Sequence, residues 1–189
     1  SEAEVHWRAF LESLQARGLR GVQYIVSDDH AGLRAARRAV FGGATWQRCQ
    51  FHLAQNAIHH APNLAVRKRI GAELREFWNA ASLAKAETSL AELVTEYRDT
   101  APKLAAWLEK NVPESLTVFT LPKHHRRRMR TSNPMERSVQ QELKRRTVKV
   151  RVFPNEAALE RLVSAVLVEI DDKWAADTKA YIKWECQDA

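Results

Sequence analysis

Val22-Gln23-Tyr24-Ile25-Val26, followed directly by Ser27-Asp28-Asp29, is the strongest strand signal in this chain of 189 residues. Because β-branched and aromatic residues favour extended backbone, the run predicts a short buried strand that ends at the acidic pair. Residues 33–40 have helical periodicity and stop at Gly42-Gly43, and residues 45–49 predict a second short strand. Strand, helix and strand in this order form the unit of a parallel sheet, so the expected fold class is α/β.

Helical periodicity dominates both sides of this unit, so the chain as a whole is expected to be mostly helical. Upstream, the apolar residues from Trp7 to Leu14 have the spacing of an amphipathic helix. Downstream, residues 52–111 predict successive helices, with Pro62 and Pro102 at breaks between them. The apolar stripes expected to face a core are Val66, Ile70, Leu74 and Phe77, then Leu83, Ala86, Leu90, Leu93, Val94 and Tyr97, and then Leu104, Trp107 and Leu108.

The last third of the chain contains two helix starts. Before them, residues 116–119 predict a short extended stretch. In the first start, Asn133 is the expected N-cap, Pro134 the first helical residue and Glu136 the third. The second start, Pro154-Asn155-Glu156, opens a helix with an apolar stripe that we expect to face a core. The stripe consists of Leu159, Leu162, Val163, Val166, Leu167 and Ile170.

The charge of the chain is concentrated in one segment. The formal net charge is +7, yet residues 123–151 hold eleven basic and two acidic residues, so the rest is close to neutral. A dense basic segment indicates a polyanionic partner, most simply nucleic acid, and the alternative is a solvated basic surface. The basic residues are Lys123, Arg126, Arg127, Arg128, Arg130, Arg137, Lys144, Arg145, Arg146, Lys149 and Arg151.

Composition excludes several classes of protein. The 45% of hydrophobic residues can bury a sizeable core, which argues against global disorder. The sequence has neither a run that predicts a transmembrane helix nor a basic-then-apolar signal peptide. Two cysteines, Cys49 and Cys186, are too few for a disulfide framework, so a reducing, cytoplasmic location is expected. P-loop, dinucleotide-binding and G-x-S-x-G motifs are absent as well.

Two acidic residues are candidates for metal-assisted chemistry. Asp28 follows a strand at the sheet edge where ligands collect, and a carboxylate there can hold a divalent metal ion. The alternative is that Asp28 or Asp29 only caps the following helix. Glu136 lies among the cations of the basic segment, which is the setting that metal-assisted phosphodiester chemistry needs. Its alternative role is the acidic half of a capping box.

Cys49-x-x-His52 is half of a zinc-ligand pattern. His59, His60, His124 and His125 could complete it, although their spacing is not diagnostic. The alternative is a buried structural cysteine with a packed histidine. A zinc-stabilised helical interaction domain therefore stays open as one hypothesis.

Four strings, in order along the chain, resemble segments of the bacterial Mutator-type insertion-sequence transposases. The first resembles the segment around the family's second aspartate, the second its Cys-x-x-His segment, the third its glutamate segment, and the fourth the helix after it. The first string is Arg17-Gly18-Leu19 with Val26-Ser27-Asp28-Asp29-His30-Ala31-Gly32-Leu33, and the second is Gln47-Arg48-Cys49-Gln50-Phe51-His52-Leu53 with Asn56. The third is Arg130-Thr131-Ser132-Asn133-Pro134-Met135-Glu136-Arg137 with Arg145-Arg146-Thr147. The fourth is Phe153-Pro154-Asn155-Glu156 with the helix that ends near Trp174.

This resemblance implies a ribonuclease H-like core with an Asp, Asp, Glu triad and an all-helical insertion between the second aspartate and the glutamate. Residues 1–55 would then be part of the core, 56–115 the insertion, and 116–189 the return to the core. Asp28 and Glu136 would be the catalytic carboxylates and the ligands of two Mg²⁺ or Mn²⁺ ions. Cys49 and His52 match a family motif near the active site. The residues expected to contact DNA are Lys123, Arg126, Arg127, Arg128, Arg130, Arg137, Lys144, Arg145 and Arg146.

The resemblance also implies DNA strand cleavage and transfer at insertion-sequence ends, with element and target DNA as partners. We expect at least a homodimer on DNA, at the bacterial nucleoid. The family's first aspartate lies on a strand upstream of the helix that contains Trp7, and this sequence begins at that helix. Asp29 is not expected to replace it, because neighbouring side chains on an extended chain point to opposite sides.

We therefore expect residues 1–189 alone to be catalytically incompetent. The strand at residues 22–26 would keep an open apolar edge, which favours aggregation or partial folding. The alternative function is a non-catalytic DNA-binding or regulatory module that uses only the basic segment.

Overall fold

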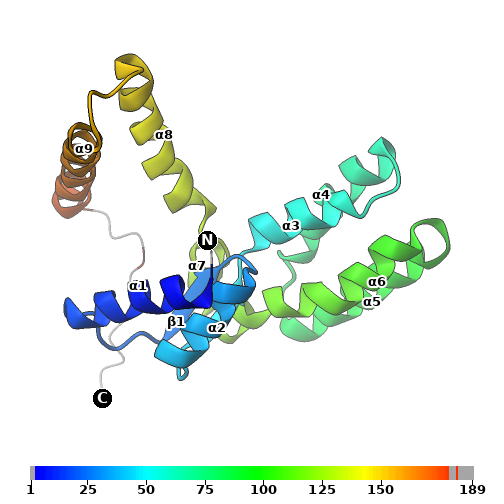
Figure 1. Cartoon of the computed structure of the whole chain (residues 1–189). Helices are drawn as coiled ribbons and strands as arrows, with labels where there is room; N and C mark the ends of the chain where they lie inside the picture. Colours follow the sequence, from blue (N-terminus) through cyan, green and yellow to red (C-terminus); the bar gives the residue numbers. More distant parts are fainter. Residues whose placement is uncertain (1–2, 179–181, 183–189) are drawn as a thin grey trace. The chain divides into compact units, whose positions relative to one another are not determined.

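The computed structural model describes residues 3–178 and 182 (Figure 1), and Trp184 and Cys186 lie outside the described residues. The chain divides into two compact units, residues 1–131 and residues 132–189, which are described separately. The three-part division expected from the sequence stays a prediction. The elements of the first unit are α1 (Glu4–Ala16), β1 (Tyr24–Ser27), α2 (Ala31–Val40), β2 (Thr45–Arg48), α3 (Gln50–His59), α4 (Leu64–Phe77), α5 (Leu83–Thr100), α6 (Pro102–Asn111), the 3₁₀ helices η1 (Val112–Ser115) and η2 (Thr117–Thr120), and α7 (Lys123–Met129).

The first unit begins with the predicted strand–helix–strand arrangement. Strands β1 and β2 pair in parallel, with Tyr24 opposite Thr45 and Ser27 opposite Arg48. Gly18 and Gly21 both have positive φ, which suits the turn between α1 and β1 and disfavours other residues there. The prediction that β1 is buried is wrong, because all four of its residues are half-buried. Within the described residues the sheet has two strands, so β2 covers one edge of β1.

Helices α3 to α6 form the hydrophobic core of this unit, and α5 and α6 lie side by side in Figure 1. The predicted stripes are confirmed in α4 and α6, and in α5 except for Leu83, which is 41% exposed because it is the first residue of the helix and lies outside the core. Pro102 is the first residue of α6. Pro62 lies between α3 and α4, as expected. Fully buried core residues include Leu53, Ile70, Leu74, Tyr97, Leu104, Leu108 and Val112.

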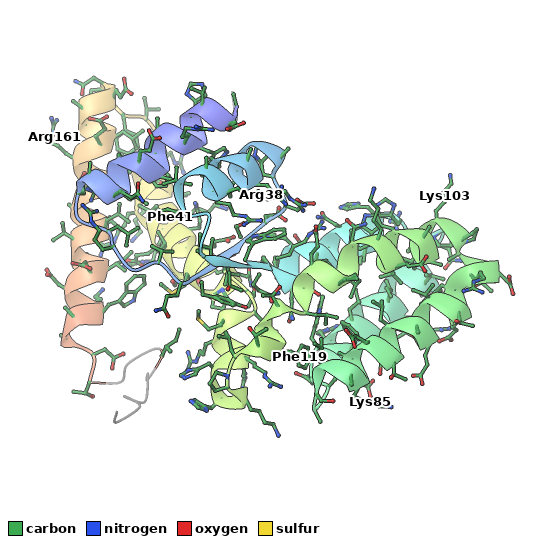
Figure 2. The ribbon with its side chains drawn as sticks, turned by 90° about the horizontal axis from the view of Figure 1, so that it is seen from below. Arg38, Phe41, Lys85, Lys103, Phe119 and Arg161 are labelled. Atoms are coloured by element: carbon green, nitrogen blue, oxygen red, sulfur yellow. The ribbon has the colours of Figure 1, made fainter. Side chains whose placement is uncertain are left out.

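The extended stretch predicted at residues 116–119 is wrong, since residues 117–120 form η2. Val118 and Phe119 are buried against the helical core, and the Val118 N–H donates to Gln47 Oε1 at 2.6 Å. The side chain of a buried glutamine thus satisfies a backbone group that a strand partner would otherwise satisfy. Figure 2 shows Phe119 in the segment that leads from the helical part into α7.

The second unit contains α8 (Asn133–Val150) and α9 (Glu156–Ala176). Helix α8 begins one residue earlier than predicted, with Ser132 rather than Asn133 as its N-cap. The start of α9 is confirmed, because Asn155 Oδ1 accepts a hydrogen bond from the Ala158 N–H at 2.9 Å.

The stripe on α9 only partly faces a core. Val166 and Ile170 are buried, but Leu159 and Leu167 are 38% and 42% exposed. Helix α8 itself has no buried residue. Among the described residues, none of the helices combines the length and the apolar content that crossing a bilayer requires.

Candidate functional site

Asp28 lies directly after β1 and is exposed. Its Oδ1 accepts a hydrogen bond from the Asp29 N–H at 2.8 Å, and Oδ2 has no protein partner in the described part of the chain. The alternative role as a helix cap is wrong, because His30 is the N-cap of α2 and its Nδ1 accepts from the Leu33 N–H at 3.3 Å. The carboxylate of Asp28 therefore has no structural task in the start of α2.

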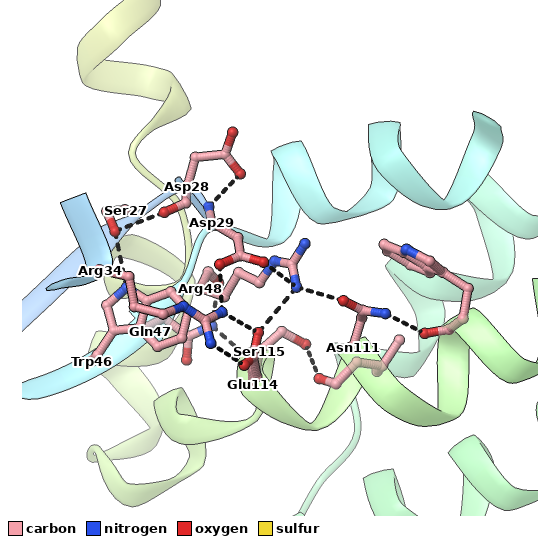
Figure 3. Close-up of polar contacts among 12 residues, drawn as sticks. Ser27, Asp28, Asp29, Arg34, Trp46, Gln47, Arg48, Asn111, Glu114 and Ser115 are labelled. Carbon is pink, nitrogen blue, oxygen red and sulfur yellow. Dashed lines mark hydrogen bonds and ion pairs between the residues drawn. The ribbon is translucent and has the colours of Figure 1, made fainter. Parts of the chain in front are cut away.

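Asp29 points away from Asp28 and into a network of charged side chains (Figure 3). It forms ion pairs with Arg34 and with Arg48, whose Nη1 lies 3.2 Å from Asp29 Oδ2. The expectation that the adjacent acids point to opposite sides is consistent with this arrangement. Asp29 has a structural role, and Asp28 is left to face solvent.

Glu114 of η1 completes the network and ties the helical part to the sheet. Both terminal nitrogens of Arg34 donate to its carboxylate at 3.0 Å. Arg48 Nη1 lies 3.0 Å from Glu114 Oε2 and donates to Asn111 Oδ1 at 3.0 Å. The Arg48 side chain is only 4% exposed, so its charge depends on these partners. The sequence analysis missed Arg34, Arg48 and Glu114, since no local pattern links residues so far apart.

Trp46 and Gln47 of β2 support the same region. The Trp46 indole donates to Ser27 Oγ at 2.9 Å, and the Arg34 and Arg37 guanidiniums lie 4.7 and 4.3 Å from its ring centroid. Gln47 is fully buried and donates through Nε2 to the Ser115 carbonyl at 2.8 Å. These contacts explain why a tryptophan and a glutamine occupy a strand of only four residues.

Cys49 and His52 lie at the start of α3. Cys49 is fully buried at the N-cap, with Sγ 3.3 Å from Thr131 Oγ1. His52 is half-buried, and its ring meets Phe51 edge-on at 5.3 Å between centroids. In the described residues no three His, Cys, Asp or Glu side chains lie close enough together to hold a metal ion. The zinc hypothesis gains no support from this structure, and the role of the motif stays a prediction.

Glu136 is exposed in the first turn of α8, and Ser132 Oγ donates a hydrogen bond to its Oε1. This side chain–side chain bond is not the capping-box arrangement, because Ser132 makes no side-chain cap hydrogen bond and Glu136 is the fourth residue of α8. Asp28 belongs to the first unit and Glu136 to the second. The catalytic role of both residues stays a prediction.

The predicted DNA-contacting residues of α7 and its end divide into two groups. Lys123, Arg127 and Arg128 are exposed. Arg126 and Arg130 are half-buried and donate to protein oxygens, Arg126 Nε to the Leu121 carbonyl at 2.9 Å and Arg130 Nη1 to Asn79 Oδ1 at 2.9 Å.

In the second unit, Arg137 and Lys144 are exposed, whereas Arg145 and Arg146 both bind Glu142. Arg146 Nη2 also lies 2.8 Å from Glu169 Oε2, which joins α8 to α9. Arg146 therefore has a structural contact in addition to its predicted role at DNA.

The α8–α9 unit is expected to lose stability in acid. Hydrogen bonds from Arg145 and Arg146 hold the pKa of Glu142 at about 2, against 4.5 ordinarily. A depressed carboxyl pKa stabilises the fold above the unfolded-state value, and this stabilisation is lost as pH falls from about 4.5 to 2. Glu142→Gln should therefore weaken amide-exchange protection of α8 at pH 5 and show a smaller further loss in acid. Glu160→Gln, an exposed α9 acid, should behave as wild type, and equal pH profiles for all three proteins would contradict the prediction.

Comparison with known proteins identifies the family. A sequence model of one protein family, described as "Transposase, Mutator family", matches residues 1–177 of the chain. The chain belongs to the Mutator family of transposases. The resemblance seen in the four sequence strings is thereby confirmed.

Individual members of the family show how much of a transposase the chain spans. It is 50% identical, over 97% of its length, to the transposase of insertion sequence IS406 from Burkholderia multivorans, and covers 47% of that protein. It is 39% identical, over 92% of its length, to the ISRM5 transposase of Rhizobium meliloti, and covers 43% of that protein. It is 30% identical, over 97% of its length, to the IS256 transposase of Staphylococcus aureus, and covers 47% of that protein. The chain spans less than half of each relative.

Proposed function

We propose that this chain is part of the catalytic domain of a DNA transposase that cuts and joins strands at the ends of an insertion sequence. One observation supports this most directly. In a chain of the Mutator family, Asp28 presents an exposed carboxylate at the carboxyl end of β1 and does not cap α2. The proposed architecture is a partial ribonuclease H-like core, with the helices of residues 56–115 as its insertion.

Asp28 and Glu136 are the proposed ligands of Mg²⁺ or Mn²⁺. Hard divalent cations prefer carboxylate oxygens, and both side chains are exposed, so the donor chemistry fits. When bound, such ions supply Lewis-acid stabilisation of the oxygens around the reacting phosphorus. The tasks of the protein are to hold the two carboxylates and to neutralise neighbouring phosphates with the basic segment. In keeping with the resemblance, the third carboxylate would come from outside these residues, so residues 1–189 alone are proposed to be inactive.

The test uses supercoiled DNA that contains insertion-sequence ends, with Mg²⁺ or with EDTA. Residues 1–189 alone should bind the DNA without nicking it. A chimera in which they replace the matching segment of the IS406 transposase, to which they are 50% identical, should nick it in Mg²⁺ and not in EDTA. Nicking by residues 1–189 alone would refute their inactivity. DNA binding without nicking by the chimera would favour the alternative, a non-catalytic DNA-binding module that uses the basic segment.

The oligomeric state is part of the same proposal. Joining two element ends requires two active sites in one complex, so at least a dimer on DNA is expected. Light scattering of the chimera with and without end DNA measures this, and a monomeric nicking complex would contradict it.

A further inference from the structure

A pocket of about 410 Å³ lies between α7 and the turn that joins α4 to α5. Four of the residues around it are cations, and none is acidic. The lining residues are Trp78, Asn79 and Ala80 from the turn, and Lys123, Arg126, Arg127 and Arg130 from α7 and its end.

Arg126 lines this pocket and is held in place by hydrogen bonds to the protein. Its Nε donates to the Leu121 carbonyl at 2.9 Å, Nη2 to the Phe119 carbonyl at 3.2 Å and Nη1 to the Ala81 carbonyl at 3.5 Å. Its guanidinium also lies over the Phe119 ring, 5.1 Å from the centroid. These bonds use three of the five N–H donors of Arg126 and hold the side chain in place, so we assign it the supply of positive charge and shape to the pocket.

Arg130 is held from one side only. Its Nη1 donates to Asn79 Oδ1 at 2.9 Å and lies 3.5 Å from the Trp78 carbonyl, while Nη2 has no partner among the described residues. Burial, together with the charge of Arg127, lowers the pKa of Arg130. A bound anion would offset the repulsion between these cations, and the side chain is already positioned to receive one.

We propose that this pocket binds one phosphate group of a DNA strand, through Lys123, Arg127 and Nη2 of Arg130. The turn at residues 78–80 would then lie against DNA, which makes the helical insertion part of the DNA-binding surface. A phosphate suits several converging donors, because its oxygens accept hydrogen bonds from more than one cation at a time. The inference rests on the proposed function, which provides DNA as the partner.

The salt dependence of DNA binding tests the inference. For double-stranded DNA, the slope of log K against log salt concentration falls by about 0.9 for each phosphate contact that is lost. Because Lys123 and Arg127 are proposed to share one phosphate, K123A/R127A should reduce the slope of residues 1–189 by about one rather than two. The matched control R67A/K68A removes two exposed charges from α4, outside the pocket, and should leave the slope unchanged.

Each other outcome overturns a defined part of the inference. An unchanged slope in K123A/R127A, with DNA bound tightly by wild type, refutes the pocket and leaves the proposed function standing. A decrease in slope that corresponds to two lost phosphate contacts refutes the assignment of Lys123 and Arg127 to one shared phosphate. No DNA binding by wild type refutes both the inference and DNA as the partner of this segment. The last outcome combines two measurements: inorganic phosphate raises the Tm of wild type but not of K123A/R127A, and the salt-dependence slopes of DNA binding are equal for the two proteins. The pocket would then be a site for a small free anion, and its assignment to DNA would be refuted.

Discussion

Asp28→Asn is expected to abolish strand cleavage by the IS406 chimera without changing its stability. Loss of a metal-binding carboxylate removes several kcal/mol of transition-state stabilisation, which corresponds to a decrease of at least about a thousandfold in the nicking rate. Asparagine keeps an oxygen that can accept from the Asp29 N–H, which is the hydrogen bond that Asp28 forms in the structure. The free energy of unfolding should therefore change by no more than about 0.5 kcal/mol.

Asp29→Asn is the matched control, because it changes the neighbouring residue in the same way. Asp29 lies in the ion-pair network with Arg34 and Arg48, so its neutralisation should cost about 1–2 kcal/mol of stability. Nicking should continue below the lowered unfolding temperature. Plasmid nicking and urea denaturation of both variants separate the two roles. Cleavage that survives Asp28→Asn, or that is lost in Asp29→Asn with the fold intact, would show that the two aspartates have been assigned the wrong roles.

Local patterns were sufficient to predict most elements of the first unit. The β-branched run before Asp28 and the glycines after α2 specify the strand–helix–strand arrangement, and stripes at helical spacing specify α4 to α6. Residues 116–119 were misassigned because a short apolar run has no period of its own. Their conformation depends on Gln47, about seventy residues earlier, whose side chain accepts from the Val118 N–H.

The candidate site shows the same division between local and distant information. The sequence singled out Asp28, but it could not distinguish a cap from an exposed carboxylate, because that depends on His30 taking the cap of α2. Asp29 pairs with Arg34 of α2 and Arg48 of β2, and both arginines also pair with Glu114 of η1. Glu114 lies 80 and 66 residues from these arginines, and opposite charges so far apart in sequence form no recognisable motif. Likewise, Arg126 and Arg127 are adjacent arginines that the sequence does not distinguish. In the structure, Arg126 donates hydrogen bonds to backbone carbonyls, whereas Arg127 is exposed.

Arg48→Ala is expected to destabilise the first unit by about 3 kcal/mol. Its side chain is 4% exposed and pairs with Asp29 and Glu114, so truncation leaves two partly buried carboxylates that only Arg34 neutralises. Arg38→Ala, an exposed change on α2, should cost no more than about 0.5 kcal/mol. Urea denaturation of both variants measures the difference.

A double-mutant cycle then tests whether the network is the cause. If Arg48 acts through Glu114, the cost of Arg48→Ala should be smaller in a Glu114→Gln background, where one of the two carboxylates is already neutral. Equal costs in both backgrounds would refute a role through Glu114 and assign the effect to the other contacts of Arg48, with Asp29, Asn111 and the Trp107 ring, whose centroid lies 5.8 Å from the guanidinium. Coupling between the two residues would mean that η1 and β2 are held together by this pair of charges.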